Sequence, residues 1–213
     1  MDLDNFHRLK NTLAAGCKLI AVSKGQSMEK IQALYNKGQR DFGENFLQEL
    51  QGKKIQLPED IIWHFLGNIQ SNKLYEVMNC SDLTHSIGRK KIYDKLLTFQ
   101  SEKEKNILLQ LKLGDEESKS GFTEHEIYEI INTHPVNCPI VIKGLMVIAE
   151  NNISTSEITN QFHFAAAVFK KIKLLDKNIE FLSMGMSGDF NIALDAGSNM
   201  IRIGTSLFGD RKK

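Results

Sequence analysis

The most constraining feature of this sequence is a regular alternation of short apolar runs with longer stretches of helical spacing, along nearly all of its 213 residues. The short runs are rich in β-branched residues, which favour strands, whereas the longer stretches repeat apolar residues at the period of a helix. Eight short runs occur, at residues 18–22, 40–42, 61–66, 82–87, 106–113, 140–148, 180–184 and 200–203. The pattern therefore predicts eight strands separated by helices.

The predicted helices complete the repeat. They span residues 28–37, 45–52, 71–78, 90–103, 124–132, 156–175 and 191–196. Eight strands alternating with helices indicate an α/β fold of the (β/α)8 or TIM-barrel type, because an open doubly wound sheet has about five or six strands. An extra N-terminal helix at residues 3–13 is expected to cap one end. Nothing in the sequence resembles a linker, so a single domain over residues 1–213 is expected.

The charge balance excludes two classes of partner. Lys and Arg total 27 against 26 Asp and Glu, a formal net charge of +1, so the chain offers no basic field for nucleic acid. No apolar run approaches the ~18 residues that a membrane helix requires. The N-terminus lacks the cationic and apolar regions of a signal peptide. We therefore expect a cytoplasmic protein with a small-molecule partner, no nucleic acid and no membrane.

The cysteines and histidines form no metal-binding pattern. Cys17, Cys80 and Cys138 lie far apart with no Cys-x-x-Cys pair, and the six histidines include no His-x-x-x-His pair. Neither a disulfide framework nor a metal site is expected.

A TIM barrel carries its functional residues in the loops after the strands, with phosphate bound after the seventh and eighth. Lys24 ends the first apolar run. It is either a lysine whose charge reaches solvent at a strand end or a desolvated amine that acts as a Schiff-base nucleophile. Small and hydroxyl residues follow the last two runs, among them Ser187, Gly204 and Thr205. Their backbone amides and the helices that follow predict a phosphate-binding cup.

Three further polar residues lie in or after predicted strands. Arg202 alternates with Ile201 and Ile203, so it is expected to project into the barrel, where it needs either an internal carboxylate or a ligand. Asn45 is either a helix cap or a site residue. His64 is either a core histidine with its hydrogen bonds satisfied or a site residue. The segment 119–122 is interpreted as a solvated loop.

Several motifs occur in the order and register of one known family. They are AVSK at 21–24, FGEN at 42–45, WHFLG at 63–67, KSG at 119–121, GLM at 144–146, LSMGMSGDF at 182–190 and IRIGT at 201–205. Over nearly its whole length the chain resembles the YggS/PROSC family of pyridoxal 5′-phosphate (PLP) homeostasis proteins.

This resemblance implies a fold-type III barrel like the N-terminal domain of alanine racemase, with the cofactor held as a Schiff base. The implied cofactor-binding residues are Lys24 for the Schiff base, Ser187, Gly204 and Thr205 for the phosphate, Arg202 for the pyridine nitrogen, and Asn45, His64 and Met184 for the pocket lining. Some positions depart from the family pattern, namely Gly25-Gln26, Phe46 and Gly88. These departures affect details of the pocket only.

Three functions are compatible with these residues. The first is a monomeric carrier that buffers PLP and delivers it to apo PLP-dependent enzymes, without catalytic residues or robust turnover. The second is a racemase-like enzyme that uses Lys24 as a base. The third is a barrel isomerase or aldolase for a phosphorylated metabolite. We favour the carrier, because an arginine at the ring nitrogen weakens the electron sink and only ten residues follow Ile203, leaving no room for the second domain of alanine racemase.

Overall fold

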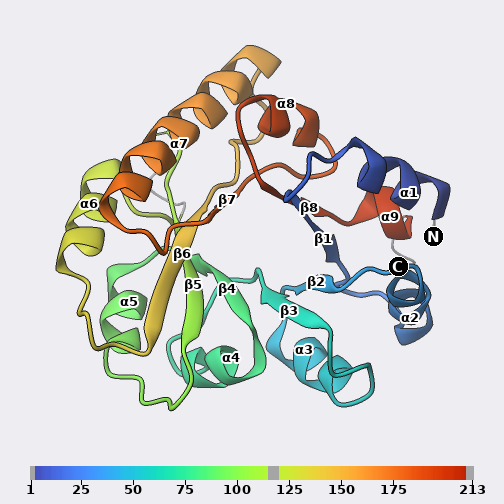
Figure 1. The fold of residues 1–213 in the computed structure, drawn as a ribbon, viewed down its shortest axis with the longest axis horizontal. Coiled ribbons are helices and arrows are strands. Elements are labelled where there is room, and N and C mark those ends of the chain that lie inside the picture. Colours follow the sequence, from blue (N-terminus) through green and yellow to red (C-terminus); the bar gives the residue numbers. More distant parts are fainter. Residues whose placement is uncertain (1–2, 115–119, 210–213) are drawn as a thin grey trace.

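The computed structural model describes residues 3–114 and 120–209, and its strands form a closed parallel barrel in the order β1 to β8, with β8 pairing back to β1 (Figure 1). The strands are β1 (Lys18–Val22), β2 (Asp41–Glu44), β3 (Ile62–Phe65), β4 (Leu83–Ile87), β5 (Lys105–Gln110), β6 (Ile140–Met146), β7 (Phe181–Ser183) and β8 (Met200–Ile203). The barrel predicted from the eight apolar runs is confirmed.

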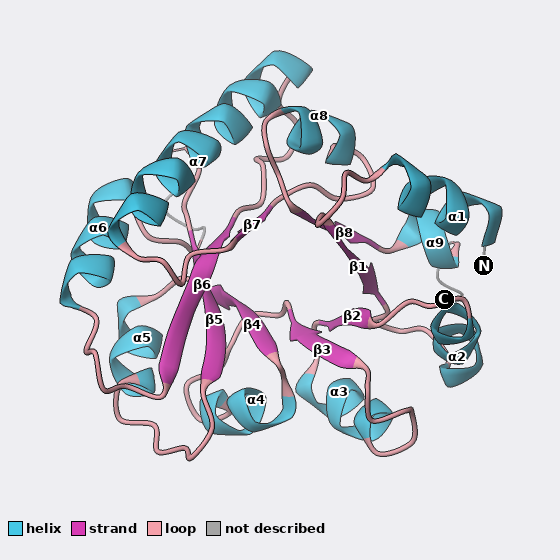
Figure 2. Ribbon diagram, viewed as in Figure 1, coloured by secondary structure: helices cyan, strands magenta, loops and turns pink. Residues whose placement is uncertain are grey.

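Helices surround the barrel as an outer ring (Figure 2). They are α1 (Leu3–Thr12), α2 (Met28–Asn36), α3 (Leu47–Lys54), α4 (Leu74–Cys80), α5 (Lys90–Leu96), α6 (Glu124–Thr133), α7 (Thr155–Leu175), α8 (Phe190–Asp195) and α9 (Thr205–Phe208). Local sequence fixes several of their ends. Thr123 and Ser154 open α6 and α7 with capping boxes, in which the hydroxyl accepts from an amide three residues on and the glutamate there reaches back.

Some boundaries differ from the sequence prediction. Helix α5 ends at Leu96, well short of residue 103, and the Thr98 hydroxyl donates to the Lys95 carbonyl at its end. The four-residue helix α9 was not predicted, because so short a helix has no periodicity to detect.

The interpretation of 119–122 as a solvated loop is wrong for Phe122, which is 2% exposed. The amide of Gly121 donates to the carbonyl of Gly88, and a Cβ on Gly88 would lie 3.0 Å from that amide nitrogen. The glycine at position 88 therefore allows this segment to pack against the end of β4. Lys119 lies outside the described residues.

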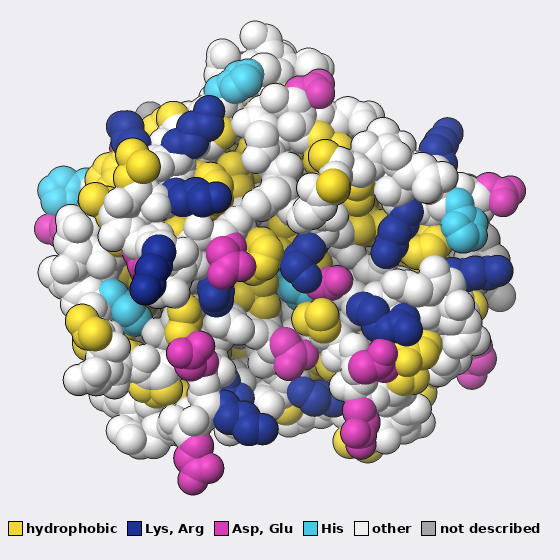
Figure 3. Space-filling model, in the orientation of Figure 1, with side chains coloured by type: hydrophobic (Ala, Val, Ile, Leu, Met, Phe, Trp, Pro, Cys, Tyr) yellow, Lys and Arg dark blue, Asp and Glu magenta, His cyan; other side chains and the backbone are white. Residues whose placement is uncertain are grey.

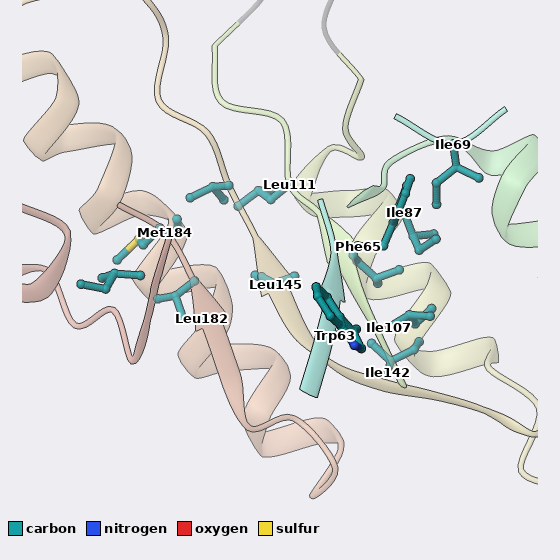
Figure 4. Packing of buried hydrophobic residues seen from close by; sticks show 14 of the residues in the cluster. Trp63, Phe65, Ile69, Ile87, Ile107, Leu111, Ile142, Leu145, Leu182 and Met184 are labelled. Atoms are coloured by element: carbon teal, nitrogen blue, oxygen red, sulfur yellow. The ribbon is translucent and has the colours of Figure 1, made fainter. Parts of the chain in front are cut away.

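Alternating side chains along the strands separate two apolar clusters. The larger lies between the barrel and its helices and includes Trp63, Leu145 and Leu182 (Figure 4). The smaller lies inside the barrel and consists of Ile20, Leu83, Leu108, Met146 and Met200. Burying one side chain of this size contributes about 1.5–3 kcal/mol to the stability of the fold.

Charges of both signs are interspersed over the face seen in Figure 3. Among the described residues, no helix combines the length and apolar character needed to cross a bilayer.

Candidate functional site

A cavity of about 320 Å³ opens where β1, β2, β7 and β8 end. Its volume falls at the low end of the ~300–1,000 Å³ typical of small-molecule sites. It is lined by Val22, Lys24, Asn45, Leu66, Met146, Ile148, Met186, Ser187, Gly188, Arg202, Gly204 and Thr205. These residues follow or end strands, and in a TIM barrel that face carries the functional site.

Six of the eight predicted cofactor-binding residues line this cavity, and the structure thus brings together Lys24, Asn45, Ser187, Arg202, Gly204 and Thr205. Asn45 is not a helix cap, because α3 begins after Phe46 and has no side-chain cap.

The other two predicted residues lie elsewhere. Met184 is fully buried and lies beside Leu182 in the cluster between barrel and helices (Figure 4). His64 is 1% exposed and contacts Asp41 and His85 inside the barrel. Neither side chain lines the cavity, and both ring nitrogens of His64 have partners inside the barrel.

A buried lysine of α3, Lys53, holds the loop that carries Lys24 in place. The Nζ atom of Lys53 donates to the carbonyl of Ser23, to Oε1 of Glu44 and to Oε2 of Glu49, each at 2.8 Å. The Ser23 hydroxyl donates to Glu44 at 2.5 Å, and the Gly25 amide donates to Glu49 at 2.7 Å. Both neighbours of Lys24 are therefore held, and the half-buried lysine extends from a fixed backbone.

We call this set of contacts, which Lys53 makes with Ser23, Glu44 and Glu49, the Lys53 brace. Burial has the largest effect on the pKa of its glutamate, Glu44. Glu44 is fully buried, and among the described residues its Oε2 atom has no hydrogen-bond partner. Burial raises the pKa of Glu44, while hydrogen bonds and charge from Lys53 and a bond from Ser23 oppose the rise. The sequence analysis missed Glu44 and Lys53; a glutamate in an apolar strand was the available signal.

Arg202 is held inside the barrel without a carboxylate. One terminal nitrogen donates to the carbonyl and hydroxyl of Ser183 at 2.8 and 2.7 Å, and the other donates to the Val147 carbonyl at 2.8 Å. It forms no ion pair with any residue that the structure describes, so the alternative of an internal salt bridge is wrong. Burial, opposed by the charge of Asp189, lowers the pKa of Arg202 to about 10, which leaves the group cationic at neutral pH.

The two turns after β7 and β8 contribute small and hydroxyl residues to the cavity lining. Ser187 and Gly188 follow β7, and Gly204 follows β8 directly before α9. Within the described chain, the amides of Gly188 and Gly204 donate to no acceptor. Open amides and a nearby hydroxyl suit phosphate oxygens.

The fold and this arrangement define a class of protein, the barrel of the alanine racemase N-terminal domain. The family model described as "Alanine racemase, N-terminal domain" matches residues 3–212. Alanine racemase from E. faecalis shares the fold with a TM-score of 0.77 at 18% identity, over 97% of this chain and 57% of its own. At that identity the similarity concerns the fold alone.

Relatives of higher identity narrow the class. A pyridoxal phosphate homeostasis protein of Vibrio alginolyticus is 38% identical over 201 residues, which are 91% of this chain and 86% of its own. The structure of PipY from Synechococcus elongatus with PLP bound matches with a TM-score of 0.87 at 31% identity, over 97% of this chain and 99% of its own. The chain belongs to the family of pyridoxal phosphate homeostasis proteins.

Proposed function

We propose that this protein binds PLP reversibly and serves intracellular PLP homeostasis, buffering the cofactor and delivering it to apo-enzymes without robust turnover of its own. The observation that carries the proposal is the cavity that unites an amine, a guanidinium and the small and hydroxyl residues of the turns after β7 and β8. The names of the relatives and the bound PLP of PipY support it.

The donor set fits the parts of PLP. Lys24 offers an amine to the aldehyde carbon, and Arg202 offers N–H groups to the ring nitrogen. Ser187, with the amides of Gly204 and Thr205, would hold the phosphate oxygens. When bound, PLP supplies an electron sink whose strength depends on a protonated ring nitrogen.

The site weakens that sink. A guanidinium can only donate hydrogen bonds, so Arg202 favours an unprotonated acceptor at the ring nitrogen. The protein contacts of Arg202 are two carbonyls and a hydroxyl, which leave its charge uncompensated by any described carboxylate in contact. The guanidinium of Arg202 would repel the positive charge that protonation places on the ring nitrogen of PLP. This electrostatic arrangement supports a carrier over a racemase-like enzyme.

Loading with PLP tests the binding site. Wild-type protein reduced with borohydride should carry one pyridoxyl group on Lys24, located by peptide mapping. Lys24→Ala should lose this group, because Lys24 is the only lysine among the described residues that lines the cavity. Lys170→Ala, an exposed change on α7, is the matched control and should load normally. A protein that takes up no PLP, or that carries it elsewhere, contradicts the proposal.

A turnover assay separates the carrier from the racemase-like enzyme. Loaded protein is incubated with L- and D-amino acids, and racemisation, α-proton exchange in deuterium oxide and transamination are measured. Rates no faster than those of free PLP are expected. Faster rates would establish an enzyme instead. Delivery is tested in parallel by reactivation of an apo PLP-dependent enzyme, with free PLP as the control.

A further inference from the structure

A chain of polar side chains crosses the inside of the barrel beneath the cavity. Nδ1 of His85 lies 3.1 Å from the Ser183 hydroxyl, and Nε2 of His85 lies 2.9 Å from Nδ1 of His64. Nε2 of His64 lies 3.0 Å from Oδ1 of Asp41, which also accepts from Lys18 at 3.1 Å. At the other end, the Ser183 hydroxyl contacts Arg202 at 2.7 Å.

The donors and acceptors of this chain can be assigned from its two ends. Arg202 only donates, so the Ser183 oxygen accepts from it, and the only other described contact of that oxygen is Nδ1 of His85. If Ser183 donates there, Nδ1 of His85 is unprotonated and its Nε2–H donates to Nδ1 of His64. The Nε2–H of His64 then donates to Asp41.

The opposite direction carries two penalties. His64 would have to donate from Nδ1 while its Nε2 faces the carboxylate of Asp41, which requires a charged imidazolium. Ser183 would accept from both neighbours, and its own hydrogen would lack an acceptor at a site that is 0% exposed. Burial, together with the charge of Arg202, lowers the pKa of His85 well below its usual value, which also favours neutral imidazole at His85.

We propose that Ser183, His85, His64 and Asp41 form a one-directional hydrogen-bond relay, with both histidines as neutral Nε2–H tautomers, that positions Arg202. In each group of the relay the acceptor atom lies on the side nearer to Arg202, and the Ser183 oxygen contacts it directly. The dipoles of these groups therefore point their negative ends towards the buried guanidinium and stabilise it without a described counter-charge in contact. The remaining N–H groups of Arg202 can then donate to an acceptor in the cavity. That last step rests on the proposed function, in which the acceptor is the ring nitrogen of PLP.

The tautomers are measured directly by NMR on the unloaded protein with ¹⁵N-labelled histidine. Long-range correlations should show a protonated Nε2 and an unprotonated Nδ1 for both His64 and His85 at neutral pH. His85→Gln identifies its own resonances and should shift Nδ1 of His64. His125→Gln, an exposed change on α6, should leave both unchanged. An imidazolium at His64, or a protonated Nδ1 on His85, overturns the relay.

The positioning role is tested with ¹⁵N-labelled PLP. Its ring nitrogen should resonate as an unprotonated pyridine in wild type and should shift towards the protonated position in Ser183→Ala, whereas Ser183→Thr, which keeps the hydroxyl, should restore it. An unchanged resonance in Ser183→Ala overturns the positioning role. If wild type fails to bind PLP, the proposed function fails, and the histidine tautomers still decide whether the relay exists.

Discussion

At the scale of single residues, Gly67 shows how tightly the loops around the cavity pack against each other. A Cβ at this position would lie 1.9 Å from the carbonyl oxygen of Asn45, one of the residues that line the cavity. The Ser86 hydroxyl donates to the Gly67 carbonyl and fixes the same turn from the other side. The loop after β3 is therefore the surface against which the loop after β2 is set.

We predict that Gly67→Ala destabilises the protein by about 1–3 kcal/mol, the usual cost of inserting atoms into a packed site. The displaced Asn45 should also weaken PLP binding. Gly52→Ala is the matched control, because nothing lies within 4 Å of its Cβ and it sits inside α3, where alanine is favoured. Urea unfolding and PLP titration of both variants check this; a fully stable Gly67→Ala with normal affinity contradicts it.

Single residues could be placed from the sequence where a charge interrupts an apolar run. Lys24 and Arg202 are of this kind, and both reach the cavity. Met184 was assigned to the cavity by resemblance alone, but its side chain lies in the cluster between the barrel and the helices. The alternation of side chains along a strand explains this position. Ser183 projects inward to Arg202, so its neighbour Met184 projects outward to the helices.

At the scale of elements, the contact between α3 and the loop after β1 determines how Lys24 is presented. Lys53 reaches the Ser23 carbonyl and Glu44 from the last turn of its helix, in a pair where both side chains are at most 6% exposed. Removing one partner of such a pair leaves the other charge buried and unpaired.

We therefore predict that Lys53→Met destabilises the protein by about 3–5 kcal/mol at neutral pH. Burial already raises the pKa of Glu44, and loss of Lys53 raises it further. A folded-state pKa above the unfolded one gives stability that is present at acid pH and is lost as the pH rises through the folded pKa. The defect should thus be larger at pH 8 than at pH 5.

The unfolding free energies of wild type and Lys53→Met, measured between pH 5 and pH 8, test whether the loss of stability grows with pH. Lys54→Met, an exposed neighbour that bonds the Cys80 carbonyl, is the control and should show little pH dependence. A defect that grows towards acid pH would mean that Glu44 is not the group left unpaired.

Element identity could be predicted because β-branched runs and helical spacing are local properties. The Lys53 brace could not be predicted, because it joins the end of one helix to the loop after a strand some 30 residues away in sequence. The burial of Phe122 likewise depends on Gly88, a contact between separate elements.

At the scale of the whole molecule, closure of the barrel couples ligand binding to global stability, because β1 and β8 both contribute to the cavity and pair with each other. PLP at 100 times its dissociation constant should add about 2.7 kcal/mol to the unfolding free energy. For a chain of this size that corresponds to a rise in Tm of about 5–10 °C. Thermal unfolding checks this, and Lys24→Ala should show a much smaller rise.

Closure itself was predictable from the count of strand and helix units, since eight parallel strands with right-handed crossovers form a barrel. The interior relay was not predictable. It needs Asp41, His64, His85 and Ser183 from four strands to meet, and their distances depend on how the strands are staggered around the ring.

The pairing of β1 with β8 also has a consequence for synthesis. Ala21 and Ile203 are register partners, so the backbone leading to Lys24 and the turn at Gly204 become neighbours only when the last strand inserts. A nascent chain that has left the ribosome through β7 still lacks Arg202 and the Gly204 turn. We therefore expect PLP capture through this site to require the insertion of β8 next to β1.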